Sequence, residues 1–321
     1  MSETQYDVII VGGGPAGLAA AIYASRRAMK TLVISKDVGG QAAMTDEIEN
    51  YPGFETVGGL ELSQKFKDQA IKFGAEWMFN EVVGLDKAGE FFVIETGDQQ
   101  KISTKTVILA FGLTPRNLEV PGEKELAGKG VSYCAICDGP LYKNKTVTVV
   151  GSGNSALDAA EFLSKICKQV YLLSRSDQFK GEQVLLDKVQ AAANVQMIYN
   201  AVTTEIKGQS RVEALVYQTP DGQKQEIKTD GIFVEIGHIA KTSWLDGLIE
   251  LTDRREIKIG RDCQTNVPGV FGAGDIADIS YKQVVISAGE GAKAALQAYK
   301  YLQGNRPVLP DWTTKKKKTI N

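Results

Sequence analysis

The feature that most constrains the fold of this chain is a strand, a glycine-rich turn and a helix that follow one another twice. The first copy has a strand-like apolar segment at residues 6–11, the turn Gly-Gly-Gly-Pro-Ala-Gly at 12–17 and helix-forming residues at 18–24. The second has a strand-like segment at 146–150, the turn Gly-Ser-Gly-Asn-Ser-Ala at 151–156 and a helix that begins at Leu157. Between a strand and a helix, this glycine pattern is typical of a dinucleotide-binding unit. We therefore expect an α/β fold with two Rossmann-like domains.

Each turn supplies candidate residues for holding a pyrophosphate. The first glycine permits the turn, the second lets the phosphates approach the backbone, and the third small residue lets the helix pack on the strand. The start of the helix then faces the phosphates. In the first copy the expected binding residues are Gly12, Gly14, Pro15, Ala16 and Gly17. In the second copy they are Gly151, Gly153, Asn154, Ser155 and Ala156.

The strand that follows each helix should carry the groups that bind ribose. An acidic residue is expected about 20 residues past the first glycines. The strand at 31–35 is followed instead by Lys36 and Asp37, so we assign no ribose ligand there. The corresponding strand at 169–173 leads into polar residues that favour a 2′-phosphate, and hence NADP over NAD; these are Ser174, Arg175, Ser176 and Lys180. A solvated surface turn with ordinary charges is the alternative.

Two cysteines, Cys134 and Cys137, are spaced so that a disulfide can close within one turn. A cysteine near a helix start has a stabilised thiolate, and the adjoining carboxylate of Asp138 offers a proton donor and acceptor. CxxC is also half of a zinc site, but the other candidate ligands are scattered and form no second pair; they are Cys167, Cys263 and His238. An inert buried pair is a further alternative. We expect redox chemistry at this dithiol.

The remaining segments give a coarse outline of the fold. Residues 60–73 are expected to form an amphipathic helix, 76–109 several strands, and the Pro- and Gly-marked segment 110–123 a linker. The strand at 231–238 ends in Gly237 and His238, and this histidine either contacts a ligand or is a structural imidazole. Asp275 follows a strand and two glycines, so it either accepts a hydrogen bond from a ribityl or ribose hydroxyl or caps a helix. A helix of small residues is expected at 288–301.

Composition excludes several classes of function. A length of 321 residues allows two domains with substantial cores, and the net charge of −2 provides no broad basic field for nucleic acid or a membrane surface. No apolar run reaches the about 18–20 residues of a membrane span. Four cysteines, two of them isolated, and an N-terminus without a signal-peptide pattern indicate a reducing, cytoplasmic compartment. The four lysines at 315–318 are expected to form either a solvated tail or a patch that docks an anionic partner.

Two dinucleotide sites and one CxxC together make an electron relay from nicotinamide to flavin to disulfide. On these motifs the chain resembles the low-molecular-weight thioredoxin reductases over almost its whole length. The resemblance also rests on Gly40-Gln41, on Glu49-Asn50-Tyr51-Pro52-Gly53 and on the sequence Gly-Ala-Gly-Asp at 272–275. It implies FAD at the first fingerprint, with further contacts from Gly40, Gln41, Asn50, Gly274, Asp275, Lys282, Gln283 and Val284. It also implies NADPH at the second fingerprint, with a further contact from Gly237.

The resemblance further implies a discontinuous FAD domain at 1–117 and 246–321, with an NADPH domain inserted at 118–245 that carries the CxxC. Both domains would have three layers (β/β/α), and two copies of the chain would form a homodimer in which the inserted domain rotates. By the same resemblance, Asp138 is the catalytic acid-base, Cys134 attacks the thioredoxin disulfide, and Cys137 lies nearest the flavin.

The sequence departs from the family pattern in three places. At the 2′-phosphate site the family usually has His-Arg-Arg and a further Arg, and the matching positions here hold Ser174, Arg175, Ser176 and Lys180. The usual Arg-Gln near the flavin is Lys282-Gln283, and the Pro-Asn after Gly237-His238 is Ala240-Lys241. These changes allow an enzyme that takes NADH or another donor such as ferredoxin. A dithiol oxidase that uses oxygen and a non-catalytic redox-signalling flavoprotein are further alternatives. The intact CxxC and second fingerprint argue against the signalling protein.

Overall fold

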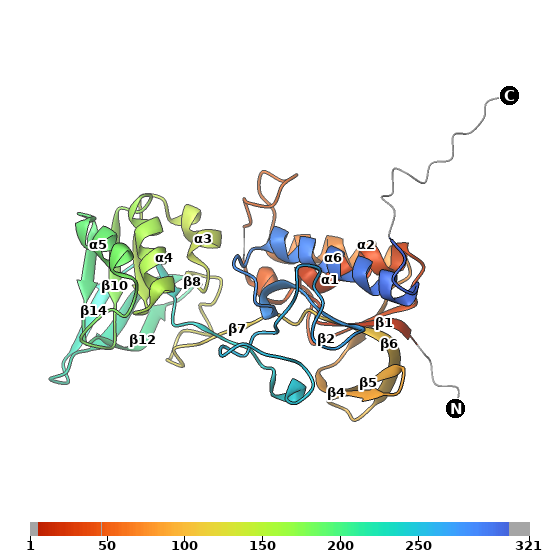
Figure 1. The fold of residues 1–321 in the computed structure, drawn as a ribbon. Coiled ribbons are helices and arrows are strands. Elements are labelled where there is room, and N and C mark those ends of the chain that lie inside the picture. Colours follow the sequence, from red (N-terminus) through yellow and green to blue (C-terminus); the bar gives the residue numbers. More distant parts are fainter. Residues whose placement is uncertain (1–5, 46, 308–321) are drawn as a thin grey trace. The chain divides into compact units, whose positions relative to one another are not determined.

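The computed structural model describes residues 6–45 and 47–307, and the lysines at 315–318 lie outside them. The chain divides into two compact units (Figure 1). The first comprises residues 1–43, 61–113 and 240–321, and the second comprises 44–60 and 114–239. The expected division differs from this one mainly at 44–60, where a bridge between Ile48 and Val57 closes a separate loop. Which nucleotide each unit binds stays a prediction.

The first unit is built on a sheet with the strand order β3-β2-β1-β6-β5-β4, and β17 also pairs with β6. Its parallel strands are β1 (Tyr6–Val11), β2 (Thr31–Ser35), β3 (Glu76–Phe79), β6 (Lys101–Leu109) and β17 (Val270–Gly272). In β1 the side chains of Val8 and Ile10 enter one core, while those of Ile9 and Val11 enter another. A strand covered on both faces reads as a continuous apolar run, which is why residues 6–11 show no polar alternation.

Three helices cover one face of the parallel strands, and the antiparallel hairpin that continues the sheet from β6 shares a core with β1 and β2 on the other face (Figure 1). The helices are α1 (Pro15–Arg26), α2 (Gly59–Lys72) and α6 (Val284–Leu302), and the hairpin is β4 (Val82–Ala88) with β5 (Phe91–Thr96). Helix α6 crosses α1 so closely that a Cβ at Gly291 would collide with the backbone carbonyl oxygen of Ala16. The small residues of α6 therefore allow the contact that fixes the start of α1.

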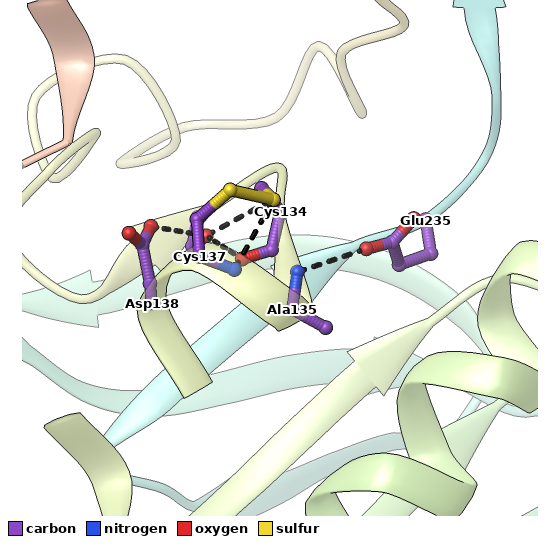
Figure 2. The surroundings of a disulfide bond; sticks show 6 residues. Cys134, Ala135, Cys137, Asp138 and Glu235 are labelled. Carbon is purple, nitrogen blue, oxygen red and sulfur yellow. Dashed lines mark hydrogen bonds between the residues drawn. A yellow bond between two sulfur atoms is a disulfide. The ribbon is translucent and has the colours of Figure 1, made fainter. Parts of the chain in front are cut away.

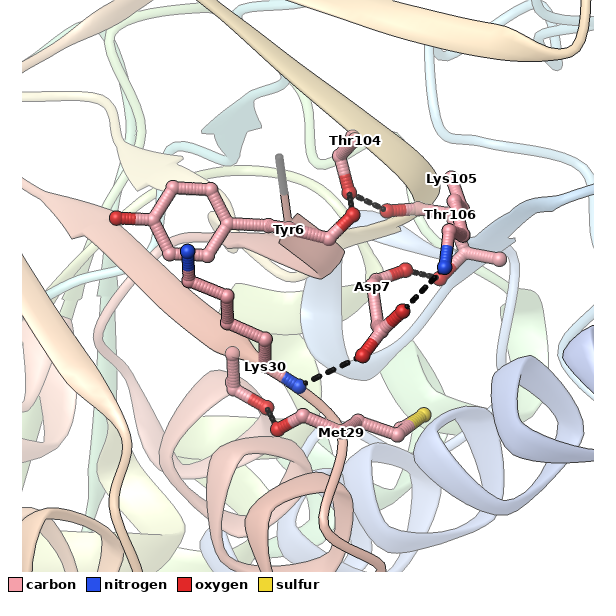
Figure 3. Close-up of polar contacts among 8 residues, drawn as sticks. Tyr6, Asp7, Met29, Lys30, Thr104, Lys105 and Thr106 are labelled. Atoms are coloured by element: carbon pink, nitrogen blue, oxygen red, sulfur yellow. Dashed lines mark hydrogen bonds and ion pairs between the residues drawn. The ribbon is translucent and has the colours of Figure 1, made fainter. Parts of the chain in front are cut away.

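Polar contacts fix the beginning of β1 against its two neighbouring segments (Figure 3). The Asp7 carboxylate accepts a hydrogen bond from the backbone N–H of Lys30 at 2.9 Å and pairs with the Lys105 ammonium at 2.8 Å. The Thr106 hydroxyl donates to the carbonyl oxygen of Asp7 at 2.7 Å. Burial acts to raise the pKa of Asp7, but its hydrogen bonds and the charge of Lys105 outweigh this effect and lower it. These contacts hold β1 in register, so that the turn after Val11 emerges at the carboxyl edge of the sheet.

The second unit contains a five-stranded parallel sheet with the order β11-β10-β9-β15-β8. Its strands are β8 (Val131–Ser132), β9 (Thr146–Val150), β10 (Gln169–Leu173), β11 (Val195–Ile198) and β15 (Gly231–Val234). Helices α3 (Ala135–Asp138), α4 (Asn154–Ser164) and α5 (Gln183–Ala191) lie on one face (Figure 1). The antiparallel strands β12 (Val202–Gly208), β13 (Val212–Gln218) and β14 (Lys224–Lys228) cover the other. Each unit therefore has three layers, and the predicted α/β fold is confirmed.

The remaining short elements connect these layers. They are the strands β7 (Thr114–Pro115) and β16 (His238–Ile239) and the 3-10 helices η1 (Gly40–Met44), η2 (Gly139–Tyr142), η3 (Ser243–Leu245) and η4 (Gly274–Ile276). One expectation is corrected here. The strand expected at 231–238 ends at Val234, and His238 instead pairs with Pro115 in the two-stranded β7–β16 ladder. The positive φ of +95° at Gly237 interrupts the extended backbone between the two segments. Among the described residues, no helix is both long and apolar enough to cross a bilayer.

Candidate active site

A disulfide between Cys134 and Cys137 lies at the start of α3 (Figure 2). Cys134 is the N-cap residue of this short helix, and the backbone N–H of Cys137 donates to its Sγ at 3.3 Å. Both cysteines are half-buried, whereas Ile136 between them is exposed. A disulfide at such a position is open to attack by an external thiolate. The structure therefore places the two predicted redox residues in one partly exposed turn of the second unit.

Asp138, at the end of α3, is held by Ser132. The Ser132 hydroxyl donates a 2.6 Å hydrogen bond to Oδ2 of Asp138 and accepts one of 3.1 Å from the backbone N–H of Cys134. One hydroxyl thus joins the carboxylate to the backbone at the first sulfur. The carboxylate lies within the same half-buried turn as the disulfide.

A second carboxylate, Glu235, reaches the same turn from the end of β15. Its Oε1 accepts a 3.3 Å hydrogen bond from the backbone N–H of Ala135, the residue next to Cys134. In Figure 2, Asp138 and Glu235 lie on opposite sides of the CxxC turn. Burial raises the pKa of Glu235 to about 7; the hydrogen bond from Ala135 opposes this, and the charge of Asp158 adds to it. Burial thus favours the neutral form of Glu235.

The first glycine turn forms a narrow connection between β1 and α1. Gly12 has a φ of +108°, and a Cβ there would lie 2.5 Å from the carbonyl oxygen of Ala110. A Cβ at Gly17 would in turn collide with the carbonyl oxygen of Gly12. The Ser35 hydroxyl accepts the N–H of Gly13 at 2.9 Å, so the strand end that lacks a ribose acid supports the turn instead.

The space beside Gly14 fits a diphosphate. Gly14 caps α1 without a side-chain hydrogen bond, and a Cβ there would meet only the carbonyl oxygen of Gly39, at 3.8 Å. Gly40 borders the same space, since a Cβ added there would lie 3.8 Å from the Cα of Gly14. Helix N-termini with free N–H groups and no side chain in front of them are suited to anionic groups. Of the predicted FAD residues, this places Gly12, Gly14, Pro15, Ala16, Gly17 and Gly40 around one cradle.

Further predicted FAD residues adjoin the same cradle. A Cβ at Gly274 would lie 2.7 Å from the Cβ of Ala16, so the 272–275 loop reaches the start of α1. Asp275 accepts a 2.9 Å hydrogen bond from the Ser287 hydroxyl, and Gln283 and Val284 begin α6. Lys282 donates to the carbonyl oxygens of Asp275 and Ala277 and pairs with Glu256, each at 2.8 Å. Its ammonium group thus holds the loop that carries Asp275.

Two predicted FAD residues have other settings. The side-chain amide of Gln41 donates to the carbonyl oxygen of Leu113 at 2.6 Å, which ties η1 to the segment that follows β6. Asn50 belongs to residues 44–60 of the second unit. Its role as an FAD contact stays a prediction.

The second glycine turn repeats the design of the first. A Cβ at Gly151 would collide with the carbonyl oxygen of Glu235, whereas one at Gly153 would meet nothing within 4 Å. Gly153 caps α4 without a side-chain hydrogen bond, Ala156 is buried against the strand, and Ser155 is exposed. Asn154 accepts the N–H of Glu182 at 2.7 Å and so ties the start of α4 to that of α5. The open space at Gly153 fits a second diphosphate.

The loop after β10 presents fewer hydrogen-bond donors for a phosphate group than its sequence suggests. Ser174 is fully buried, and its hydroxyl lies 3.0 Å from that of Ser176. Both hydroxyls donate to the carbonyl oxygen of Gln178, Ser176 at 2.8 Å and Ser174 at 3.3 Å. Arg175 and Lys180 remain exposed, and the Lys180 N–H donates to the Ser152 carbonyl at 2.7 Å. The exposed charged groups of this loop, rather than the two serines, thus adjoin the second cradle.

Gly237 and His238 lie just beyond β15, in the segment that leads to β16. The carbonyl oxygen of Gly237 accepts the N–H of Arg116 at 2.9 Å, and His238 is exposed. Cys167 and Cys263 each lie in a hydrophobic core, and burial raises the pKa of both thiols, that of Cys167 to about 11. In the described part of the chain, no three His, Cys, Asp or Glu side chains are grouped to hold a metal ion.

Sequence reasoning missed Ser132 and Glu235. Ser132 gives no signal, because a serine two residues before a cysteine is common in any loop. Glu235 does give one, since it is the single charged residue in the otherwise apolar run Gly-Ile-Phe-Val-Glu-Ile-Gly at 231–237. A charge at the end of a buried parallel strand lies where such sheets carry their functional groups.

Comparison with known proteins agrees with this geometry. Residues 6–292 match the family model described as pyridine nucleotide-disulphide oxidoreductase. The structure of thioredoxin reductase from Streptococcus pyogenes superposes with a TM-score of 0.89 at 33% identity, covering 94% of this chain and 100% of that one. That of thioredoxin reductase from Giardia duodenalis gives 0.86 at 35% identity, covering 93% and 99%.

A curated relative carries a different name. An alkyl hydroperoxide reductase subunit of Staphylococcus epidermidis is 39% identical over 305 residues, which are 94% of this chain and 60% of that protein. The chain thus spans about 60% of the length of this curated relative. The resemblance to low-molecular-weight thioredoxin reductases is confirmed at the level of family and fold, while the relatives' names differ in their substrate.

Proposed function

Since this chain belongs to the pyridine nucleotide-disulphide oxidoreductase family, we propose that it is an FAD-dependent disulfide reductase. Electrons pass from a pyridine nucleotide through FAD to the Cys134–Cys137 disulfide, and from the dithiol to a thioredoxin or thioredoxin-like redoxin. The observation that carries this proposal is the disulfide itself, half-buried and adjoining Asp138 in a chain with two glycine turns that leave open space at Gly14 and Gly153. FAD would bind the first unit and the nucleotide the second, which also carries the disulfide.

The residues of the chain have separable tasks in this reaction. The cradle at Gly14 and Gly40 would hold the FAD diphosphate, and that cofactor when bound supplies two-electron transfer between nicotinamide and disulfide. Asp138 gives a proton to a sulfur as the disulfide opens and takes one back when the dithiol is reoxidised. Ser132 keeps the carboxylate oriented by its 2.6 Å hydrogen bond. Cys134, the N-cap residue, attacks the disulfide of the redoxin.

We propose NADPH as the donor, with NADH partly accepted. A 2′-phosphate needs cationic donors, and Arg175 and Lys180 are exposed beside the second cradle while the neighbouring serine hydroxyls are bonded within their loop. Two cations favour NADPH less strongly than the arginine cluster usual in the family. We also propose that the protein acts as a homodimer in a reducing, cytoplasmic compartment.

The proposed relay is tested by anaerobic titration of the FAD-loaded protein, first with NADPH and then with NADH, while flavin bleaching and redoxin thiols are followed. Bleaching together with reduction of thioredoxin supports the proposal. Replacing Cys134 or Cys137 with Ser should abolish redoxin reduction but leave FAD bound and reducible. Normal redoxin turnover by Cys137→Ser would disprove the relay.

A second candidate acceptor is a peroxidase, the partner protein of an alkyl hydroperoxide reductase. The name of the 39% identical relative favours this candidate. This chain spans about 60% of that relative, so such a reaction would need a further redox module on this or another chain. The two acceptors are separated by supplying thioredoxin alone, the peroxidase alone, and both together. Reduction of the peroxidase only when a redoxin is present identifies the redoxin as the direct acceptor. Direct reduction without a redoxin identifies the peroxidase.

A further inference from the structure

Glu235 connects the second glycine turn to the disulfide turn. Its backbone N–H donates to the carbonyl oxygen of Val150 at 2.8 Å, and its carbonyl lies against Gly151. Its side chain extends to the backbone amide of Ala135, beside Cys134 (Figure 2). The backbone of Glu235 is therefore fixed in the sheet, and its carboxyl group is held against the residue that follows the first sulfur.

The surroundings of Glu235 are poor in compensating charge. Burial is the largest influence on its carboxyl group and favours the neutral form. Asp158 of α4 acts in the same direction, and burial, Glu161 and Glu182 raise the pKa of Asp158 itself against the opposing charge of Lys188. On α3, Asp138 adds a further carboxyl group to the same turn. A new negative charge at Cys134 would therefore arise one residue from the amide that holds this carboxylate, whose ionised form burial already disfavours.

We propose that Glu235 is a positioning residue for the redox step, and that its carboxylate takes up a proton when the Cys134–Cys137 disulfide is reduced. This inference rests on the proposed function, which supplies the electrons. In the step, two electrons break the S–S bond, one proton converts one sulfur to a thiol, and the other sulfur remains a thiolate. A second proton, taken from solvent, neutralises Glu235. Two electrons and two protons are taken up together, so the net charge of the turn does not change. The negative charge moves from the Glu235 carboxylate to the thiolate.

The proposal predicts a pH-dependent difference between wild type and Glu235→Gln, because glutamine can still accept the Ala135 hydrogen bond but cannot titrate. The protein is equilibrated with mixtures of reduced and oxidised dithiothreitol between pH 5.5 and 9. The fractions of reduced Cys134 and Cys137 are then counted by alkylation and mass spectrometry. Above about pH 7, the equilibrium constant for reduction of wild type should fall relative to that of the variant by up to about tenfold per pH unit. The ratio should level off once the carboxyl group is ionised in both redox states.

Asp230→Asn is the matched control. Asp230 precedes the same strand at its opposite end and also accepts one backbone N–H, that of Thr146 at 2.9 Å. Its variant should follow wild type at every pH. A ratio of wild type to Glu235→Gln that is constant with pH would overturn the proposal, as would an equal deviation of Asp230→Asn.

The measurement uses a chemical dithiol and no nucleotide, so it is independent of the relay. A relay that fails would appear as cysteines that pyridine nucleotide cannot reduce, while the dithiothreitol curves would be unchanged. If Glu235→Gln does not fold, the infrared difference spectrum of the Asp138→Asn protein upon reduction at pH 8 provides the test. Loss of a carboxylate band with gain of a protonated carboxyl band supports the proposal, and an unchanged carboxyl region contradicts it.

Discussion

The Ser132 hydroxyl holds the carboxylate of Asp138. It donates to this carboxylate and accepts the N–H of Cys134, so the acid and the first sulfur share one support. This geometry supports the proposed roles, proton transfer by Asp138 and its orientation by Ser132.

We predict that Asp138→Asn keeps the fold and bound FAD but slows disulfide reduction roughly 10²–10⁴-fold, the usual contribution of a positioned acid-base group. Stopped-flow measurement of redoxin reduction tests this, with Asp230→Asn as the control carboxylate. If the asparagine variant turned over at the wild-type rate, Asp138 would have only a structural role.

Glu235 gives a second prediction at this scale, on stability. The pKa of its carboxyl group is raised by burial from its ordinary value of 4.5 to about 7. The folded state therefore binds more protons than the unfolded state between these values, so stability falls as pH rises through this window. Glu235→Gln removes this loss and should stabilise the protein relative to wild type at pH 8, by up to about 3 kcal/mol, and much less at pH 5. Urea unfolding at the two pH values measures the difference, and an equal effect at both would contradict the assignment.

At the scale of the element, the contact between α1 and α6 decides whether the first cradle keeps its shape. Gly291→Ala should destabilise the first unit by about 1–3 kcal/mol, because its Cβ would collide with the Ala16 backbone, which cannot move away as a side chain can. Weaker FAD retention should accompany the loss, since Ala16 lies in the first turn of α1.

Gly289→Ala on the same helix is the matched control for Gly291→Ala. A Cβ at Gly289 meets nothing within 4 Å, so the variant should gain about 0.5–1 kcal/mol from helix propensity. Chemical unfolding and FAD release compare the two variants. Equal effects would show that close packing at Gly291 is unimportant.

The loop after β10 gives a prediction about nucleotide choice. Arg175→Ala should raise the Michaelis constant for NADPH about 10–100-fold, the equivalent of one charge-assisted hydrogen bond, and leave that for NADH nearly unchanged. Ser174→Ala should instead affect both nucleotides equally, because the buried Ser174 hydroxyl holds its loop through Ser176 and Gln178. Steady-state kinetics with both donors distinguishes the two roles. Unchanged constants in Arg175→Ala would remove the 2′-phosphate assignment.

The elements of the two glycine turns could be predicted from sequence because their causes are local. An apolar run, a glycine that allows a close backbone approach, and a helix-forming segment occur within about 20 residues in each copy, so no distant contact is needed. The buried position of Ser174 could not be predicted, because it depends on Gln178 and on the backbone of Ile198 in the neighbouring strand. The pairing of His238 in β16 could not be predicted for the same reason, since its partner Pro115 is far away in the sequence.

At the scale of the whole molecule, two units with the same three-layer architecture carry different parts of the proposed site. The first has a cradle at Gly14 and Gly40, and the second has both a cradle at Gly153 and the disulfide. Sequence motifs identified these three features, but not Ser132 and Glu235, which approach the disulfide turn from neighbouring strands. A motif contains only residues of a site that are close in sequence. A residue such as Glu235 comes from another strand and reaches the site only when the chain folds.

In the proposed relay, electrons from a pyridine nucleotide arrive at Cys134 and Cys137. The most direct test adds one equivalent of NADPH, or of NADH, to the oxidised FAD-loaded protein without oxygen, then alkylates the thiols and maps them by mass spectrometry. Cys167 and Cys263 serve as internal controls, since both are buried with raised pKa values. We expect Cys134 and Cys137 to become alkylated and the two buried thiols to remain unmodified. Bleaching of the flavin while Cys134 and Cys137 remain joined as a disulfide would contradict the proposed relay.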